Sequence, residues 1–205
     1  MEWNYEFDVV VVGSGNGALT AALCSHDGGA KTLVIEKSSQ FGGTSATSGG
    51  GVWIPNNRYA KAENVDDSDQ DARNYINSVS PEGMIKDELI ETYISEGPRM
   101  IDYLHENSQV KYRNLAHYPD YFPDNTGGKE GNRSIEPEPI FGTELGDDLG
   151  KLREQHPQTA FTMGPINMNF TQVEGQLLLG ALPGWKTQFA KLFTKYILDF
   201  AMRLK

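Results

Sequence analysis

The 205-residue sequence predicts an α/β fold that opens with a strand–helix–strand unit on a parallel sheet. Residues 7–12 read FDVVVV, a short apolar run rich in β-branched residues, which is typical of a strand buried on both faces. A glycine-rich turn and a stretch of small apolar residues fill 13–23, and a second apolar run, KTLVIE, occupies 31–36. Strand, glycine turn, helix and strand within about 30 residues are the pattern of a βαβ unit.

The helix of this unit is expected over residues 15–26. The segment 27–29, Asp-Gly-Gly, should end it, because glycine readily adopts the conformations that stop a helix. Cys24 lies within this helix, where a small packing residue is a simpler interpretation than a redox centre. No further strands of a doubly wound sheet are evident, so the sheet is expected to be incomplete within this chain.

Two more helices are expected further along. Ser68, followed three residues later by Asp71, is typical of a capped helix start. A longer helical region is expected over 81–106, where Gly97-Pro98 should break or kink it because proline lacks an amide donor. The apolar positions of this region roughly follow helical spacing: Ile85, Leu89, Tyr93, Met100, Ile101 and Leu104.

The second half of the chain has a different character. Residues 116–149 show no clear period and are rich in Pro, Gly, Asp and Asn, which predicts a long loop, either a functional lid or a solvated insertion. The tail over 185–205 is amphipathic and carries five Lys and Arg against one Asp. Its apolar face should be buried by a partner domain in preference to a membrane surface. That face comprises Trp185, Phe189, Leu192, Phe193, Tyr196, Ile197, Phe200 and Leu204.

Composition and charge exclude several classes of protein. A formal charge of -10 argues against a general nucleic-acid binder, which needs a basic surface. One cysteine leaves no intramolecular disulfide framework and no CxxC zinc site, and the four histidines show no ligand spacing, so no metal is expected. The sequence has no apolar run long enough for a transmembrane helix and no signal pattern over residues 1–6, so a cytoplasmic location is expected.

The turn after the first strand carries the pattern Gly-x-Gly-x-x-Ala over 13–18. Gly13 permits a tight turn, Gly15 allows a pyrophosphate to approach the backbone, and Ala18 lets the helix pack closely on the strand. The phosphates are then expected at the helix N-terminus. Glu36 ends the second strand, where its carboxylate can accept hydrogen bonds from both hydroxyls of a ribose. This context predicts a dinucleotide-binding site in preference to a simple glycine turn.

A second loop rich in glycine and hydroxyl side chains, GGTSATSGGG, follows at 42–51. Its amides and hydroxyls suit a second line of contacts along a long cofactor, which favours FAD over NAD. The alternative is a flexible Gly/Ser linker. The loop runs directly into the apolar segment 52–55, which should be ordered, so a cofactor role is favoured.

GSGNGALTAAL, VIEK and FGGTSATSGGGVWIPNN together resemble the FAD-dependent 3-ketosteroid dehydrogenases of the fumarate reductase/succinate dehydrogenase flavoprotein group. The stretch YPDYFP at 118–123, with later GG and NRSIEP strings, is similar to the tyrosine-bearing active-site loop of that family. The resemblance spans residues 6–205 and is strongest over 8–57 and 118–141. Members of the family are considerably longer, so the chain resembles their N-terminal portion.

The resemblance implies a Rossmann-like FAD-binding βαβ unit followed by the start of an α+β substrate domain. It also implies an oxidoreductase that removes a proton and a hydride from a 3-ketosteroid ring, with the hydride passing to flavin N5. Tyr121 is the expected match to a loop tyrosine that hydrogen-bonds to the catalytic base, with Tyr118 as the alternative. From residue type alone, both tyrosines are interpreted as aromatic packing under a loop. The implied FAD-binding residues are Gly13, Ser14, Gly15, Gly17, Ala18, Glu36, Lys37, Gly43, Thr44, Ser45, Ser48, Gly49, Gly50 and Gly51.

The expected division is an FAD-binding part over 1–115, a substrate-facing loop over 116–150 and the start of a substrate or cap region over 151–205. The expected partners are a steroid-like small molecule and a second chain that completes the flavoprotein. One alternative is a catalytically silent FAD-binding fragment or subunit. Another is a flavin enzyme for a different cyclic enone or a dicarboxylate, although no arginine or histidine cluster favours a dicarboxylate.

Overall fold

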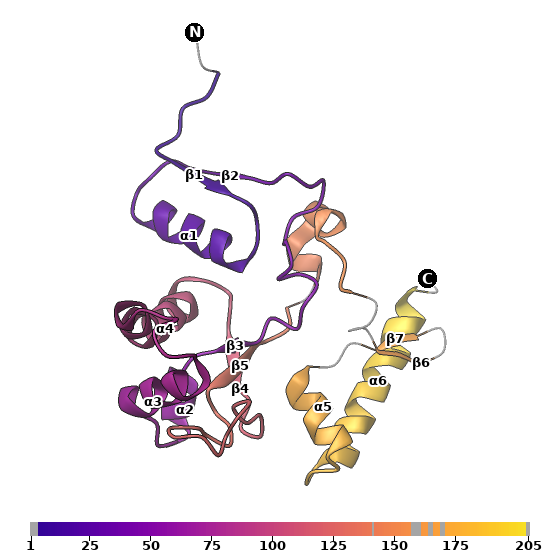
Figure 1. Cartoon of the computed structure of the whole chain (residues 1–205). Helices are drawn as coiled ribbons and strands as arrows, with labels where there is room; N and C mark the ends of the chain where they lie inside the picture. The colour runs from indigo at the N-terminus through magenta and orange to yellow at the C-terminus, as the bar shows by residue number, and fades with distance from the viewer. Residues whose placement is uncertain (1–3, 141, 157–160, 164–165, 169–170, 204–205) are drawn as a thin grey trace. The chain divides into compact units, whose positions relative to one another are not determined.

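The computed structural model describes residues 4–140, 142–156, 161–163, 166–168 and 171–203 (Figure 1). By its internal contacts the chain divides into two compact units. Unit 1 comprises residues 1–50 and 139–160, and unit 2 comprises residues 51–138 and 161–205. These units are defined by contacts within the chain, whereas the sequence predicted a division by function. The division by function stays a prediction.

Unit 1 contains the predicted βαβ unit. Strand β1 (Val9–Val12) pairs in parallel with β2 (Thr32–Ile35), and helix α1 (Asn16–Asp27) connects them and contacts both. The helix ends at Gly28, as the glycine stop predicted: the Gly28 amide donates to the Cys24 carbonyl at 3.0 Å, and the Gly29 amide donates to the His26 carbonyl at 2.8 Å. The unit also holds the kinked 3-10 segment η1 (Gly142–Lys151).

The prediction that the first strand is buried on both faces is wrong for this chain. Exposure alternates along β1, with Val10 at 51% and Val12 at 77%, because α1 covers one face of the two-stranded sheet. Cys24, expected to be a packing residue, is exposed on α1.

Unit 2 is built on a three-stranded antiparallel sheet in the order β3-β5-β4 (Figure 1). The central strand places Ile135 opposite both Val52 and Asn114. Ile135 is fully buried with Ile54 in the core cluster of the sheet. The strands are β3 (Val52–Trp53), β4 (Tyr112–Asn114) and β5 (Ser134–Pro137). Strand β5 shows that the prediction of a long loop over 116–149 is wrong at this place. No alternation of apolar and polar residues is visible here in the sequence, because the strand has a single fully apolar residue.

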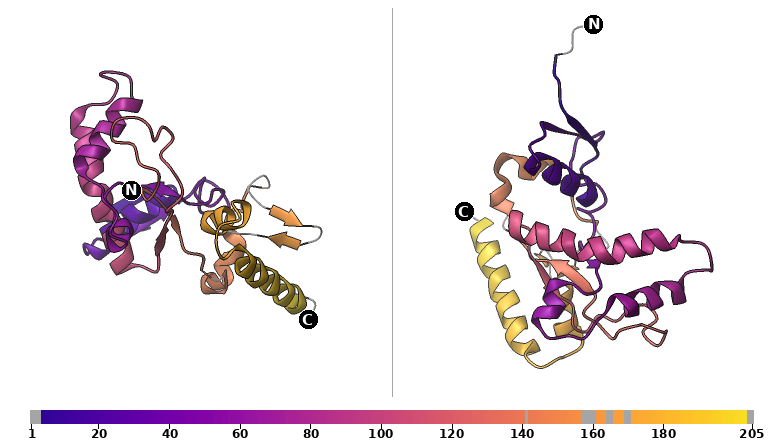
Figure 2. Two further views of the ribbon diagram at one scale, coloured as in Figure 1. Left: turned by 90° about the horizontal axis from the view of Figure 1, so that it is seen from below. Right: turned by 90° about the vertical axis from the view of Figure 1, so that its left-hand side faces the viewer.

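Helices α2 (Arg58–Ala62), α3 (Asp69–Val79) and α4 (Asp87–Asn107) accompany this sheet, and α3 runs alongside α4 (Figure 2). The Ser68 side chain accepts a hydrogen bond from the Asp71 amide, so the predicted helix cap is confirmed.

The prediction that Gly97-Pro98 breaks the long helix is wrong, because α4 continues through Pro98. Buried Ile94 on one side of the proline and Ile101 on the other belong to two separate core clusters, and this packing offsets the lost amide hydrogen bond. The buried face also differs from the predicted one. It comprises Ile90, Ile94, Ile101 and Leu104, whereas Ile85, Leu89 and Tyr93 are exposed.

The last part of unit 2 comprises β6 (Phe161–Met163), β7 (Ile166–Met168), α5 (Gln172–Leu179) and α6 (Trp185–Arg203). Buried Glu136 of β5 accepts hydrogen bonds from the first two amides of α5, at 2.6 and 3.0 Å, and so ties this helix to the sheet. No helix within the described ranges is long and apolar enough to cross a membrane.

The predicted amphipathic face of the tail is buried only in part. Leu192 is buried, whereas Trp185, Phe189, Phe193 and Ile197 are exposed. The side chains of Tyr196 and Phe200, and the whole of Leu204, lie outside the described residues.

Candidate functional site

The glycine turn between β1 and α1 has the backbone geometry that a phosphate site requires. Gly13 adopts φ +96, in the left-handed region, and its amide donates to the Ile35 carbonyl at 2.7 Å. Gly15 is the N-cap of α1 and provides no side-chain cap. The first described intrahelical bond runs from the Leu19 amide to the Gly15 carbonyl, so the amides of the preceding first-turn residues point out of the helix end.

Glu36 follows β2 directly and is oriented by two hydrogen bonds. The Ser14 hydroxyl donates to one carboxylate oxygen at 2.5 Å, and the Ser38 amide donates to the other at 3.0 Å. These bonds lower the pKa of the Glu36 carboxyl below its usual value, chiefly through the Ser14 hydroxyl, so the group is ionised at neutral pH. A carboxylate has about four acceptor positions, so acceptor capacity remains for a ribose.

The second glycine-rich loop lies directly against the first turn. The Ser45 hydroxyl accepts a hydrogen bond from the Asn16 amide at 3.0 Å, and the Gly42 amide donates to the Ser14 hydroxyl at 2.9 Å. Gly43 has φ +56, and a Cβ on it would lie 3.3 Å from the Gly15 Cα. Glycine suits so close an approach of two backbones, and the structure thus brings the two predicted segments together.

The remaining predicted cofactor residues stand apart from this cluster. Lys37 and Thr44 are exposed. Ser48 donates to the Ser45 carbonyl and accepts from the Gly50 amide, so its bonds stay within the loop. Gly51 belongs to unit 2.

The residues of unit 1 fit an adenosine diphosphate group. A Cβ at Gly13 or Gly17 would meet no atom within 4 Å, which leaves open space beside the helix end where a pyrophosphate would lie. The carboxylate of Glu36 stands at the end of the neighbouring strand, where it would hold the ribose hydroxyls. When bound, FAD would supply the hydride-accepting isoalloxazine ring.

The lowered pKa of Glu36 leads to a testable pH dependence. Because the folded pKa lies below the ordinary value of 4.5, the carboxylate contributes stability that is present above pH 4.5 and is lost as the pH falls through the lowered pKa. The free energy of unfolding of the wild-type chain should exceed that of Glu36→Gln at neutral pH, and this difference should shrink at about pH 3. Urea titrations at both pH values measure it, and a difference independent of pH contradicts the prediction.

The second candidate element is the loop of unit 2 that carries Tyr121. The Tyr121 side chain is 84% exposed, and the next residue, Phe122, is also exposed. Tyr118, the alternative, is half-buried. The Phe122 amide donates to the Tyr75 hydroxyl of α3 at 3.3 Å, so the backbone is held while the neighbouring tyrosine projects outward. The catalytic role of Tyr121 stays a prediction.

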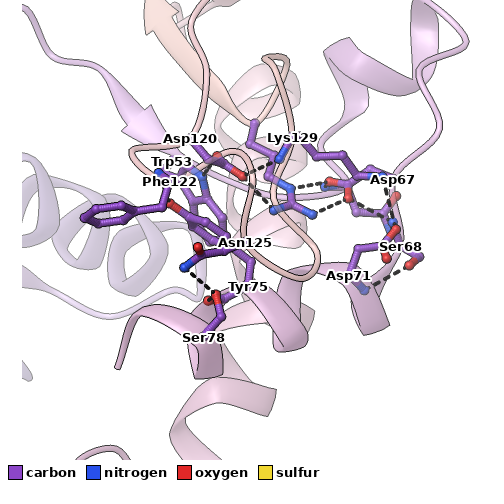
Figure 3. A network of polar contacts seen from close by, with 12 residues as sticks. Trp53, Asp67, Ser68, Asp71, Tyr75, Ser78, Asp120, Phe122, Asn125 and Lys129 are labelled. Atoms are coloured by element: carbon purple, nitrogen blue, oxygen red, sulfur yellow. Dashed lines mark hydrogen bonds and ion pairs between the residues drawn. The ribbon is translucent and has the colours of Figure 1, made fainter. Parts of the chain in front are cut away.

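A buried charged network fixes this loop on unit 2 (Figure 3). Arg133 donates to Asp120 at 2.8 Å and makes two bonds to Asp67, at 2.7 and 3.1 Å. Asp120 also accepts from the Trp53 indole at 2.6 Å and from the Lys129 amide at 3.0 Å. The side chains of the three charged partners are at most 5% exposed, so each carboxylate depends on its partners for the hydrogen bonds that water would supply.

Sequence reasoning assigned no role to these residues. Asp120 directly precedes Tyr121, but its partners Trp53 and Arg133 are 67 and 13 residues away along the chain. Asp120 lies in the aromatic stretch YPDYFP, whereas Asp67 and Arg133 lie in polar stretches without aromatic residues, so the sequence carries no clear signal for this network.

The βαβ unit, the glycine turn and the acidic residue after the second strand define a dinucleotide-binding protein of the α/β class. The FAD binding domain family matches residues 8–185, and the chain belongs to this family. The predicted FAD-binding fold and FAD as the cofactor are therefore confirmed.

Known relatives agree with the resemblance seen in the sequence. The 3-oxosteroid 1-dehydrogenase of Mycolicibacterium smegmatis is 38% identical over 168 residues, covering 82% of this chain and 29% of that protein. The 4-oxocyclohexanecarboxylate 2-dehydrogenase of Sinomonas cyclohexanicum is 38% identical over 157 residues, covering 77% of this chain and 27% of that protein.

A solved structure is similar over nearly the whole chain. It is the crystal structure of 3-ketosteroid delta1-dehydrogenase from Sterolibacterium denitrificans in complex with 1,4-androstadiene-3,17-dione. The TM-score is 0.86 at 38% identity, covering 97% of this chain and 34% of that chain. The chain thus spans about a third of the length of the proteins that it matches.

Proposed function

We propose that the chain is the FAD-holding part of an oxidoreductase that removes two hydrogens from the ring of a 3-ketosteroid. The position of the new double bond would be the one for which the 3-oxosteroid 1-dehydrogenases are named. The observation that carries the proposal is the likeness to the Sterolibacterium enzyme, which extends over 97% of the chain and includes the Tyr121 loop. A carbon acid next to a ketone needs a base and stabilisation of the developing oxyanion.

Within this proposal the residues of the chain have separate roles. The glycine turn and Glu36 bind the adenosine end of the cofactor, and the loop at 42–51 extends that contact. Tyr121, presented on its anchored loop, faces the substrate and hydrogen-bonds to a base that a second chain or a further segment supplies. A cytoplasmic location also stays a prediction.

Two other functions remain as distinct outcomes. The Sinomonas relative is named for a small cyclic ketone, which favours a non-steroid cyclic ketone as the second candidate substrate. A catalytically silent FAD-binding subunit is the third candidate, because the chain spans about a third of its relatives' length.

The test is the visible absorption spectrum of the purified chain after FAD is added and unbound FAD is removed. Near-stoichiometric flavin bands are expected. Because the base comes from outside this chain, anaerobic 4-androstene-3,17-dione should bleach these bands once the further segment or second chain that supplies the base is added. In that mixture, bleaching by 4-oxocyclohexanecarboxylate alone supports the second candidate, and bound flavin that neither ketone bleaches supports the silent subunit. A colourless protein overturns the proposal that this chain holds FAD.

A further inference from the structure

Among the described residues of unit 1, Ser14 is the buried polar residue, with 3% of its surface exposed. It occupies the second position of the glycine turn, between Gly13 and Gly15. The family resemblance implied only that it is one of the FAD-binding residues. A buried hydroxyl must find partners, and the partners of this one connect three segments of the predicted cofactor site.

The Ser14 hydroxyl uses both of its hydrogen-bonding capacities. It donates to Glu36 at 2.5 Å, in the short range typical of a charge-assisted bond to a carboxylate. It accepts from the Gly42 amide at 2.9 Å, and this second bond is buried. One hydroxyl therefore joins the phosphate turn, the ribose-binding carboxylate and the first residue of the second loop.

Gly42 is fixed in turn by its own surroundings. Its φ is +106, and a Cβ there would lie 2.6 Å from the Ala46 Cβ, so only glycine fits. Its carbonyl accepts from the Ala46 amide at 3.1 Å, which starts the turn that carries Ser45 back to the end of α1. Loss of the Ser14 hydroxyl would leave the Gly42 amide buried without this partner and would release one of the two bonds that orient Glu36.

We propose that Ser14 is a positioning residue, which preorganises Glu36 and the Gly42 loop for the adenosine diphosphate end of the cofactor. The inference rests on the proposed FAD site and assigns to Ser14 a coupling role beyond the shape of the turn. Preorganisation raises affinity because the ligand does not have to order these groups when it binds.

The test measures the Kd of the purified chain for ADP and for FAD by calorimetry. Ser14→Ala should weaken both ligands by roughly 10- to 100-fold, the range for loss of a hydrogen bond to a charged group. Ser39→Ala, an exposed serine of the same unit, is the matched control and should leave both affinities unchanged. Ser14→Cys keeps a similar volume with a weaker donor, and it carries the test if the alanine variant does not fold.

A double-mutant cycle with Glu36→Gln separates coupling from simple structural support. If Ser14 acts through Glu36, the loss caused by Ser14→Ala should be several-fold smaller in the Glu36→Gln background. Equal losses in both backgrounds overturn the coupling, and wild-type affinities in Ser14→Ala or Ser14→Cys overturn the positioning role. If the wild-type chain binds neither ADP nor FAD, the proposed FAD site itself is refuted. This result differs from the two outcomes above, in which the wild-type chain still binds both ligands.

Discussion

Replacing Arg133 by leucine is expected to destabilise unit 2 by about 3–5 kcal/mol, the range for breaking a buried ion pair. Its guanidinium is 1% exposed, and the two partner carboxylates, Asp67 and Asp120, are 5% and 2% exposed. The substitution leaves two carboxylates buried beside an apolar side chain. Because domains are stable by only about 5–15 kcal/mol, such a loss would unfold much of the population.

Urea unfolding followed by circular dichroism measures this effect. Arg99→Leu is the matched control, because Arg99 pairs with Glu96 at the surface, where an ion pair contributes about 1 kcal/mol or less. Adding Asp67→Asn and Asp120→Asn to Arg133→Leu should restore part of the stability, since the buried charges are then removed. An Arg133→Leu variant within about 1 kcal/mol of the wild type would show that the network is not a major source of stability.

The local part of the fold was predictable from the sequence. The βαβ unit is encoded within residues 7–36, where strand, glycine turn and helix signals follow one another. The same holds for the cap of α3, which depends on Ser68 and a residue three positions away. Both features depend on residues close together in the sequence, and both of these predictions were confirmed.

Burial and long-range pairing were less predictable. Exposure of Val10 and Val12 depends on which elements cover the second face of the sheet, a property that the strand sequence does not contain. The continuity of α4 through Pro98 depends on two core clusters on either side of it. The pairing of Arg133 with Asp67 bridges 66 residues, and no spacing rule indicates it.

The candidate site shows the same difference between local and long-range features. Gly13, Gly15 and Glu36 were identified because a dinucleotide imposes a fixed pattern on nearby residues. The contact of Gly42 with Ser14 joins positions 28 residues apart, and only the folded chain reveals that one hydroxyl links both glycine loops. The role predicted for Tyr121 rests on resemblance, and the structure adds that its loop is anchored through Asp120.

Gly15→Val is expected to abolish FAD binding, with a Kd raised more than about 100-fold, while the fold is preserved. A Cβ at Gly15 would lie 3.5 Å from the Ser45 hydroxyl, an ordinary contact, and the residue has φ -73 and ψ 172, which any amino acid adopts. The fold itself therefore leaves room for a Cβ at this position. The pyrophosphate does not, because a side chain here would occupy the space through which it approaches the amides of α1.

Flavin fluorescence titration measures the affinity, and thermal unfolding without FAD measures the effect on the fold. Gly150→Val is the control, because Gly150 lies in the same unit and a Cβ there would meet no atom within 4 Å. The decisive combination is lost affinity with an unfolding midpoint close to that of the wild type. Flavin retention by Gly15→Val would place the phosphates elsewhere, and the space beside Gly13 and Gly17 would then need another occupant.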